Sequence, residues 1–141
     1  MVDEELKEKM EEKIADEEFT VDDLPEYMTL FCQICNENDE IQDEIDEEGF
    51  RNKVMHFYLD GAPDFTMEIK DRKFSWKPGT EGDWGAMLKV SAENFAKLVI
   101  GEEDGQNLYM AEELEAHGGL PAMIKFQTIA GIVLEEIEGM F

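Results

Sequence analysis

The C-terminal segment 120–137 is the most hydrophobic part of the chain, and apolar residues occupy more than one of its faces at helical spacing. A helix on the surface of a soluble protein needs only one apolar stripe. The second apolar surface must therefore be covered by a neighbouring element, by a second subunit or by an apolar ligand. The apolar positions are Leu120, Met123, Ile124, Ala130, Leu134 and Ile137 on one face, and Phe126, Ile129, Ile132 and Val133 on its flank.

Two helices are expected in the first third of the chain. Residues 3–18 show apolar positions at four-residue spacing among Glu and Lys, a pattern that fits either a charged helix or a frayed tail. A longer helix is expected over 23–48, with Asp22 or Asp23 as its cap and Pro25 in its first turn. Its single apolar stripe predicts that it lies as a layer on a core.

From residue 53 the apolar period changes to two, which is typical of strands. Three alternating runs between residues 53 and 77 predict a three-stranded meander. The pair Asp60-Gly61 strongly favours a tight turn, whereas Asp71-Arg72 is a weaker turn signal because neither residue is a glycine.

The remaining elements complete a mixed architecture. A fourth strand is expected over 84–90, and Ser91 is the expected cap of a helix that ends at Gly101. A short helix over 106–113 and a strand over 114–118 then precede the C-terminal helix. Runs of strands separated from runs of helices predict an α+β domain with helices on one face of the sheet.

Charge is distributed unevenly along the chain. The formal net charge is −24, and residues 1–50 hold 20 Asp and Glu against three Lys. Binding to phosphate backbones or anionic head groups requires clustered Lys or Arg. We therefore expect no nucleic-acid partner and at most transient membrane contact.

Neither a membrane span nor a secretory signal is expected. The longest apolar run falls far short of the roughly 20 residues that a spanning helix needs. The N-terminus opens with Asp3, Glu4 and Glu5 rather than with a basic patch and an apolar core. We expect a cytoplasmic protein, and a length of 141 residues fits a single domain.

Four short sequence motifs between residues 91 and 127 resemble those of a known family. They are Ser-Ala-Glu-Asn-Phe at 91–95, Gly-Glu-Glu-Asp at 101–104, Leu-Tyr-Met at 108–110 and Met-Ile-Lys-Phe-Gln at 123–127. In this order and spacing they resemble the sterol carrier protein type 2 domain family, over about residues 54–129. With the helix that precedes the sheet, the lipid-binding domain is expected to span 23–141, and residues 1–22 form an acidic N-terminal extension.

The resemblance implies a five-stranded, largely antiparallel sheet with helices packed on one face, enclosing a hydrophobic tunnel for sterols, fatty acyl chains or similar lipids. It implies no catalytic residue. An acyl chain can bind through apolar contact alone, because each buried methylene contributes about 0.8 kcal/mol. A polar sequence motif is therefore not required.

Three positions depart from the family pattern. Gly105 replaces the usual proline, Glu112 the usual glycine and Glu113 the usual lysine. If the family's basic residue contacts a charged ligand, Glu113 reverses the sign of that contact. Anionic ligands such as acyl-CoA are then less favoured than the family alone implies.

Ten residues are the expected lining of the tunnel, although each of them also fits ordinary core packing. Nine methionines in the chain are consistent with an adaptable cavity, since thioethers repack around ligands of varied shape. Trp76 and Trp84 flank the loop at Pro78, where indoles fit either a tunnel mouth or edge packing. The expected lining residues are Met87, Phe95, Leu98, Val99, Leu108, Met110, Leu120, Met123, Phe126 and Ile129.

Cys32 and Cys35 form a Cys-x-x-Cys pair with three interpretations. A zinc site would need two more ligands, and only His56 and His117 remain as nitrogen donors. A redox pair is typical of a helix N-terminus, whereas this pair falls in the middle of a helix. We favour two reduced thiols in a core, and we expect no metal, no cofactor and no catalytic activity.

The sequence therefore predicts non-enzymatic binding or transfer of a hydrophobic small molecule in an internal apolar cavity. The alternative is an acidic protein-interaction or oligomerisation module, in which the spare face of the C-terminal helix, with Met140 and Phe141, forms a homodimer. A thiol oxidoreductase that uses Cys32 and Cys35 is a third class.

Overall fold

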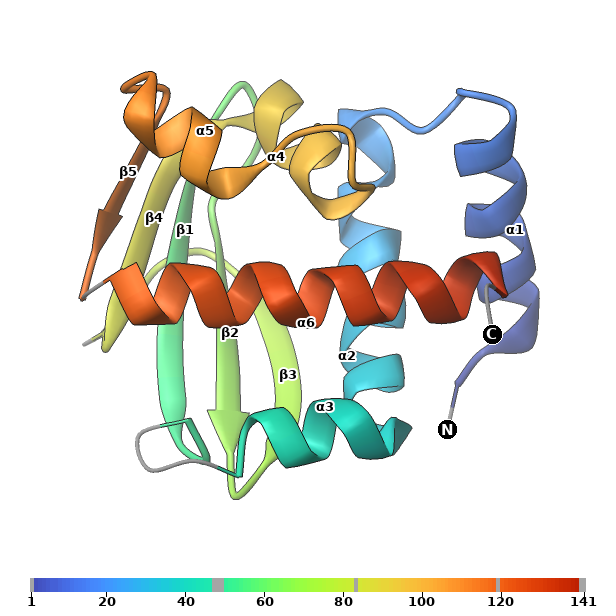
Figure 1. The fold of residues 1–141 in the computed structure, drawn as a ribbon, viewed down its shortest axis with the longest axis horizontal. Helices are drawn as coiled ribbons and strands as arrows, with labels where there is room; N and C mark the ends of the chain where they lie inside the picture. The colour runs from blue at the N-terminus through green and yellow to red at the C-terminus, as the bar shows by residue number, and fades with distance from the viewer. Residues whose placement is uncertain (1, 47–49, 83, 119, 140–141) are drawn as a thin grey trace.

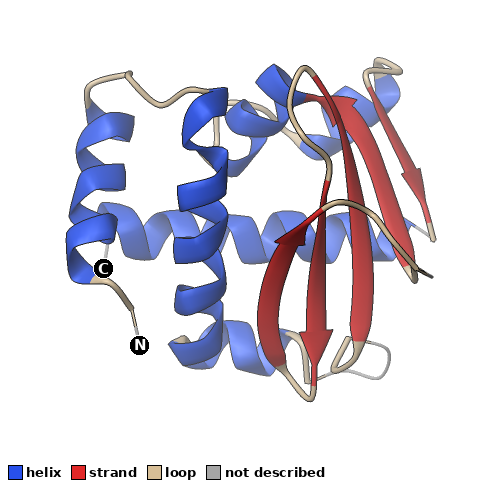
Figure 2. Cartoon of the chain, turned by 180° about the vertical axis from the view of Figure 1, so that it is seen from behind, coloured by secondary structure: helices blue, strands red, loops and turns tan. Residues whose placement is uncertain are grey.

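A five-stranded sheet carries the helices of the chain on one face, as Figures 1 and 2 show. The computed structural model describes residues 2–46, 50–82, 84–118 and 120–139, with Leu120 described by its backbone alone. The elements in chain order are α1 (Glu4–Ala15), the 3-10 helix η1 (Val21–Asp23), α2 (Leu24–Glu37), α3 (Asp39–Glu44), β1 (Lys53–Asp60), β2 (Phe65–Lys70), β3 (Lys73–Pro78), β4 (Ala86–Ser91), α4 (Ala92–Val99), α5 (Gly105–Met110), β5 (Leu114–His117) and α6 (Leu120–Glu138).

The strand order is β3-β2-β1-β4-β5, which confirms the expected α+β fold and its largely antiparallel sheet. The β1–β4 pair is parallel, and the other three pairs are antiparallel. Phe57 of β1 pairs with Phe65 of β2 and Leu88 of β4, and its ring packs on Phe126 of α6. Alternate residues of a strand face opposite sides, so His56 lies on the face turned away from the helices.

The β2–β3 turn forms without a glycine. Asp71 and Arg72 adopt φ of 50° and 67°, the left-handed conformation that a two-residue hairpin of this kind requires. Two neighbouring residues hold the turn: the Asp71 N–H donates to Asn52 Oδ1 at 3.1 Å, and the Arg72 N–H donates to the Arg51 carbonyl at 3.0 Å. These contacts compensate for the weak local signal.

The single helix expected over 23–48 is wrong, because the structure divides this segment into α2 and α3. Asn38 has an extended backbone, and its Oδ1 accepts a hydrogen bond from the Ile41 N–H at 3.0 Å. An asparagine in this role starts a new helix, so Asn38 ends α2 and caps α3.

The apolar helix α6 is covered by the domain itself. It contacts α1, α2, α3, α4, α5 and β5. Figure 1 shows α6 running across the whole layer of helices. Val133 and Ile137 are fully buried, whereas Ile124 is 44% exposed. The second apolar surface of this helix is therefore covered by neighbouring elements, which is one of the three solutions that the sequence allows.

Helix α1 takes part in this covering layer. Met10 is fully buried, and α1 packs against α2 and α6. Lys9 pairs with Glu26 at 2.9 Å and Lys13 with Asp23 at 2.6 Å, so charged contacts join α1 to the start of α2. Residues 4–15 thus form a packed helix rather than a frayed tail.

Candidate functional site

Most of the expected lining residues lie in the interior of the domain. Met87 is half-buried on the sheet face opposite the helices, and Met110 is 82% exposed. The side chain of Leu120 lies outside the described residues, as do Met140 and Phe141. The buried members are Phe95, Leu98, Val99, Leu108, Met123, Phe126 and Ile129.

Aromatic rings fill the space between the sheet and α6. The ring centroid of Phe126 lies 5.1 Å from that of Phe57, 5.6 Å from that of Phe31 and 6.1 Å from that of Phe95. Phe57 stacks on Phe65 with centroids 4.6 Å apart. In this conformation, aromatic side chains pack against one another between the sheet and α6. The enclosed tunnel stays a prediction.

A polar groove of about 380 Å³ lies between α4 and α6. It includes Leu98 and Val99, but its rim carries Glu102, Glu103 and Asp104. This mixture of polar and apolar groups does not suit the chain of a lipid, which needs a predominantly apolar lining.

A more apolar site is a cavity of about 330 Å³ beside the β1–β2 turn, which we call the hairpin cavity. Its walls come from η1 and the first turns of α2, from the β1–β2 turn, and from β3. Most lining side chains are apolar, as is typical of small-molecule sites. The lining residues are Val21, Asp22, Leu24, Pro25, Met28, Leu59, Gly61, Ala62, Pro63, Asp64, Phe65, Trp76 and Pro78.

One wall of the hairpin cavity is fixed by a capped turn. The Thr20 N–H donates to Asp23 Oδ2 at 2.9 Å, and Lys13 Nζ donates to Asp23 Oδ1 at 2.6 Å. Burial alone would raise the pKa of Asp23, but the hydrogen bonds from Lys13 and Thr20 and the charge of Lys13 together lower it. These contacts position Val21 and Leu24 against the cavity.

The opposite wall is fixed by the β1–β2 turn and by β3. Gly61 has φ of 103°, a conformation that side chains disfavour, and Asp64 Oδ1 accepts a hydrogen bond from the Leu59 N–H at 2.8 Å. The Trp76 indole N–H donates to Thr29 Oγ1 at 3.0 Å, which holds β3 to α2. Phe65 forms the floor and continues into the stacked rings of the interior.

Sequence reasoning identified one of these lining residues, Trp76, as a residue that fits a tunnel mouth. Trp84, with which it was paired, is 42% exposed near His117 and does not line the hairpin cavity. Leu59 and Phe65 belong to the predicted strands, where periodicity marks them only as apolar positions, and most of the other lining residues come from turns and helix starts, where it gives no signal.

The thiols lie in an unreactive environment. Both cysteines are free and buried, and burial raises the pKa of Cys32 to about 12 and that of Cys35 well above its usual value. His56 and His117 lie on β1 and β5, away from α2. Within the described ranges, no group of three or more His, Cys, Asp or Glu side chains is placed to hold a metal ion.

Comparison with protein families assigns the chain. The model of the SCP-2 sterol transfer family matches residues 31–131, and the chain therefore belongs to this family. Membership implies lipid binding or transfer by a domain that is generally non-catalytic. A comparison with curated proteins gave no match. Across the parts of the chain that the structure describes, no helix is long and apolar enough to cross a membrane.

Solved structures share the fold at low sequence identity. The UbiJ-SCP2 ubiquinone synthesis protein is 17% identical with a TM-score of 0.58, over 74% of this chain and 85% of that one. Sterol carrier protein domain 2 of Helicoverpa armigera is 12% identical with a TM-score of 0.60, over 77% and 85% of the two chains. The sec-alkyl sulfatase PisA1 is 9% identical with a TM-score of 0.59, over 76% of this chain and 16% of that one. The fold therefore also occurs inside larger enzymes.

Proposed function

We propose that this protein binds a hydrophobic small molecule without chemical conversion, and that the apolar part of the ligand occupies the hairpin cavity. The supporting observation is the lining of this cavity, which joins apolar residues from three separate parts of the fold. Each ligand methylene that leaves water in such a site contributes about 0.8 kcal/mol. A single alkyl chain can then bind usefully without a strong polar contact.

The volume limits the size of the bound portion. At about 330 Å³ the cavity lies near the lower end of the range of roughly 300–1,000 Å³ that small-molecule sites occupy. It suits one alkyl chain or one end of a larger lipid. A longer ligand would have to displace Phe65, beyond which Phe57 and Phe95 lie.

Contact between a ligand and the interior residues of the expected tunnel lining stays a prediction. They would contact a ligand only after such a displacement, because the rings of Phe95 and Phe126 now pack against each other and against Phe57. The alternative of an oligomerisation module is not favoured, because Val133 and Ile137 on α6 are already covered within the domain.

The test combines co-purification with a blocked variant. Native mass spectrometry should detect lipid on the purified protein, and calorimetric titration with decanol should show one binding site. Ala62→Phe should fill the hairpin cavity and weaken decanol binding at least about tenfold, since a ligand excluded from the cavity loses the burial of several methylenes. Ala111→Phe, on the exposed turn after α5, is the matched control and should bind as the wild type does.

Two results would contradict the proposal. Failure of the wild-type protein to bind any alkyl-chain probe would remove the function itself. Equal binding by the wild type and Ala62→Phe would leave a lipid-binding protein whose site is elsewhere.

A further inference from the structure

The hairpin cavity has two ionisable lining residues, and both are acids. Asp22 is exposed at the mouth beside α2, and Asp64 is half-buried in the β1–β2 turn. Asp64 Oδ1 already accepts a hydrogen bond from the Leu59 N–H, which fixes this carboxylate at the wall. A ligand head group at this mouth therefore meets negative charge.

The cations that reach the start of α2 are already engaged. Lys13 pairs with the buried Asp23, and Lys9 pairs with Glu26. The lining residues include no lysine, arginine or histidine. A bound carboxylate would thus have to compete with Asp23 or Glu26 for its counter-ion.

The N-terminus of α2 does not supply a site for an anion either. A helix N-terminus ordinarily attracts anions through its free N–H groups and its dipole. Here Pro25 lacks an N–H group, and Asp22, Asp23 and Glu26 already surround the first turn. Side-chain carboxylates therefore occupy the place that a ligand anion would take.

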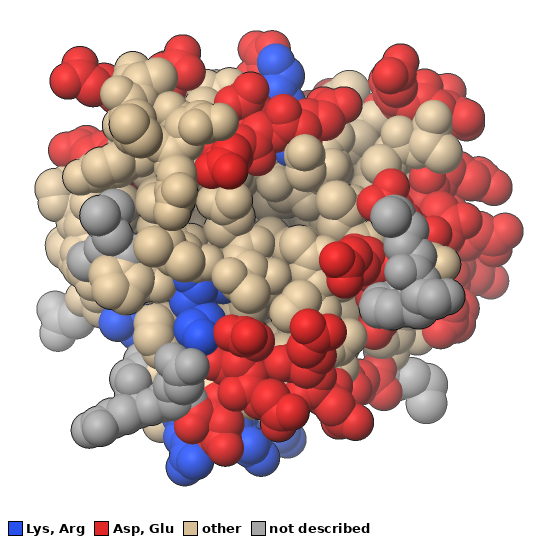
Figure 3. All heavy atoms as spheres, in the orientation of Figure 1, with Lys and Arg blue, Asp and Glu red and all other residues tan. Residues whose placement is uncertain are grey.

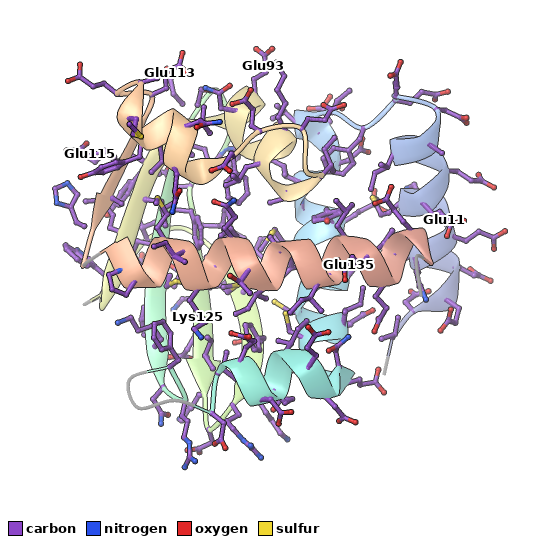
Figure 4. The ribbon with its side chains drawn as sticks, in the orientation of Figure 1. Glu11, Glu93, Glu113, Glu115, Lys125 and Glu135 are labelled. Carbon is purple, nitrogen blue, oxygen red and sulfur yellow. The ribbon has the colours of Figure 1, made fainter. Side chains whose placement is uncertain are left out.

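A second acidic surface adjoins the cavity. A groove of about 490 Å³ shares Leu59 and Asp64 with it and crosses β4 and β5. Its charged lining consists of Lys89 against Asp60, Asp64, Glu112, Glu113 and Glu115. We call this surface the acidic groove; Figure 4 shows Glu113 and Glu115 projecting from its α5–β5 side.

We infer that the hairpin cavity selects a single-chain lipid with a neutral or positively charged head group and discriminates against fatty-acid carboxylates. The inference rests on the proposed function, and it adds the chemical class of the ligand. The alkyl chain enters between α2 and the β1–β2 turn, and the head group stays at the mouth near Asp22 and the acidic groove. The wider field is also negative: Figure 3 shows acidic side chains gathered at the top, right and lower parts of the face shown, and the formal net charge of the chain is −24.

The experiment compares three probes with different head groups: decanol, decylamine and undecanoate, which all carry the same ten-carbon alkyl chain, together with decanoate, whose alkyl chain is one methylene shorter. Calorimetric titration at low ionic strength should show decanol and decylamine binding at least about tenfold more tightly than undecanoate, because the surface field disfavours an anion. The difference should shrink as salt is added, since the screening length falls from about 30 Å at 0.01 M to about 8 Å at 0.15 M. Ala62→Phe should abolish binding of decylamine, which separates entry into the cavity from adsorption on the acidic surface.

A pair of charge variants locates the effect. Asp22→Asn should strengthen decanoate binding about two- to fivefold, the range for one exposed charge interaction. Glu135→Gln removes the same charge from the exposed side of α6, where Figure 4 labels it, and should leave decanoate binding unchanged.

The outcomes separate the two proposals. Undecanoate binding as tightly as decanol in the hairpin cavity would overturn the inference and leave the proposed function intact. Absence of binding by all of the probes would overturn the proposed function and the inference with it.

Discussion

Two apolar regions of this domain meet at Phe65, and they are filled in different ways. On one side, Phe57, Phe95 and Phe126 pack ring against ring between the sheet and α6, and each is at most 1% exposed. On the other side, the hairpin cavity leaves about 330 Å³ between walls that are mostly apolar. Both regions have apolar surfaces that are removed from water on folding. Local geometry determines whether side chains fill the space between these surfaces or leave a cavity.

The geometric difference lies in the parts of the fold that meet. The interior is built from the middles of strands and helices, whose side chains reach across the layer and interlock. The hairpin cavity is built from ends: the start of α2 at Pro25 and the short residues Gly61, Ala62 and Pro63 of the β1–β2 turn. Small side chains at a turn cannot fill the space that opposes them.

The largest expected effect breaks the packed region. Phe126→Ala should lower the free energy of unfolding by about 3–5 kcal/mol, because a buried ring is replaced by a cavity. Urea unfolding measures this loss. Ile124→Ala, at an exposed position of the same helix, should change stability by no more than about 0.5 kcal/mol. A loss below about 1 kcal/mol for Phe126→Ala would indicate that the interior is loosely packed.

The next variant joins the two regions. Phe65→Ala should cost about 3 kcal/mol and should extend the hairpin cavity toward Phe57 and Phe95. Longer alcohols should then gain affinity, by up to about fourfold for each added methylene, since each contributes about 0.8 kcal/mol. Titration with decanol and dodecanol measures the change. Phe74→Ala, buried on β3 but outside the cavity lining, should lose stability without changing the chain-length preference.

The third variant tests whether α1 belongs to the packed region. Met10→Ala should destabilise the domain by about 2 kcal/mol, because this side chain is fully buried where α1 packs on its neighbours. Glu11→Ala, next to it on the exposed side of α1 in Figure 4, is the control. Unchanged stability in Met10→Ala would mean that α1 does not contribute to the core.

A smaller effect concerns the turn that fixes the cavity wall. Asp23→Ala should cost about 1 kcal/mol through the lost cap, and the exposed Glu8→Ala should cost little. The difference in the free energy of unfolding between the wild type and Asp23→Ala should depend on pH. The pKa of Asp23 is lowered from 3.8, so its contribution is present above that pH and is lost as the pH falls through the folded-state value.

The upper limit of this pH window comes from Lys13. Hydrogen bonding to Asp23 raises the pKa of Lys13 above 10.5, so its contribution is complete below that pH and is lost as the pH rises through the folded-state value. Urea unfolding across this range should show a plateau in the difference between wild type and Asp23→Ala. A difference that stays constant at acidic pH would contradict the role of this pair.

The smallest effect is expected at the thiols. With the pKa of Cys32 at about 12, only about one molecule in ten thousand carries its thiolate at pH 8. An aromatic disulfide reagent should therefore modify the native protein far more slowly than the protein in urea. Rapid modification of native Cys32 and Cys35 would revive the thiol oxidoreductase hypothesis.

Periodicity predicted most of the fold. The alternation from residue 53 identified the β1–β2–β3 meander, and Ser91 caps α4 by accepting a hydrogen bond from the Asn94 N–H at 3.1 Å. The break at Asn38 was missed because apolar residues continue at helical spacing across it. The parallel pairing of β1 with β4 depends on residues more than 30 positions apart, which no local pattern encodes.

The candidate site was less accessible from sequence. Seven of the ten expected lining residues are buried, but a core residue and a ligand-contacting residue share the same apolar character. The hairpin cavity brings Val21, Ala62 and Trp76 together from separate parts of the chain. Of these, Trp76 alone had a sequence signal, because an indole beside a Pro-Gly loop fits the mouth of a site.

The most direct test asks which of the two apolar regions a bound lipid touches. Intermolecular nuclear Overhauser effects between decanol and the protein's methyl groups distinguish them, since Met28 and Ala62 line the hairpin cavity and Met123 and Ile129 lie in α6. The alkyl chain is expected to contact Met28 and Ala62. Contacts to Met123 and Ile129, with none to Met28 or Ala62, would place the ligand in the interior and contradict this expectation.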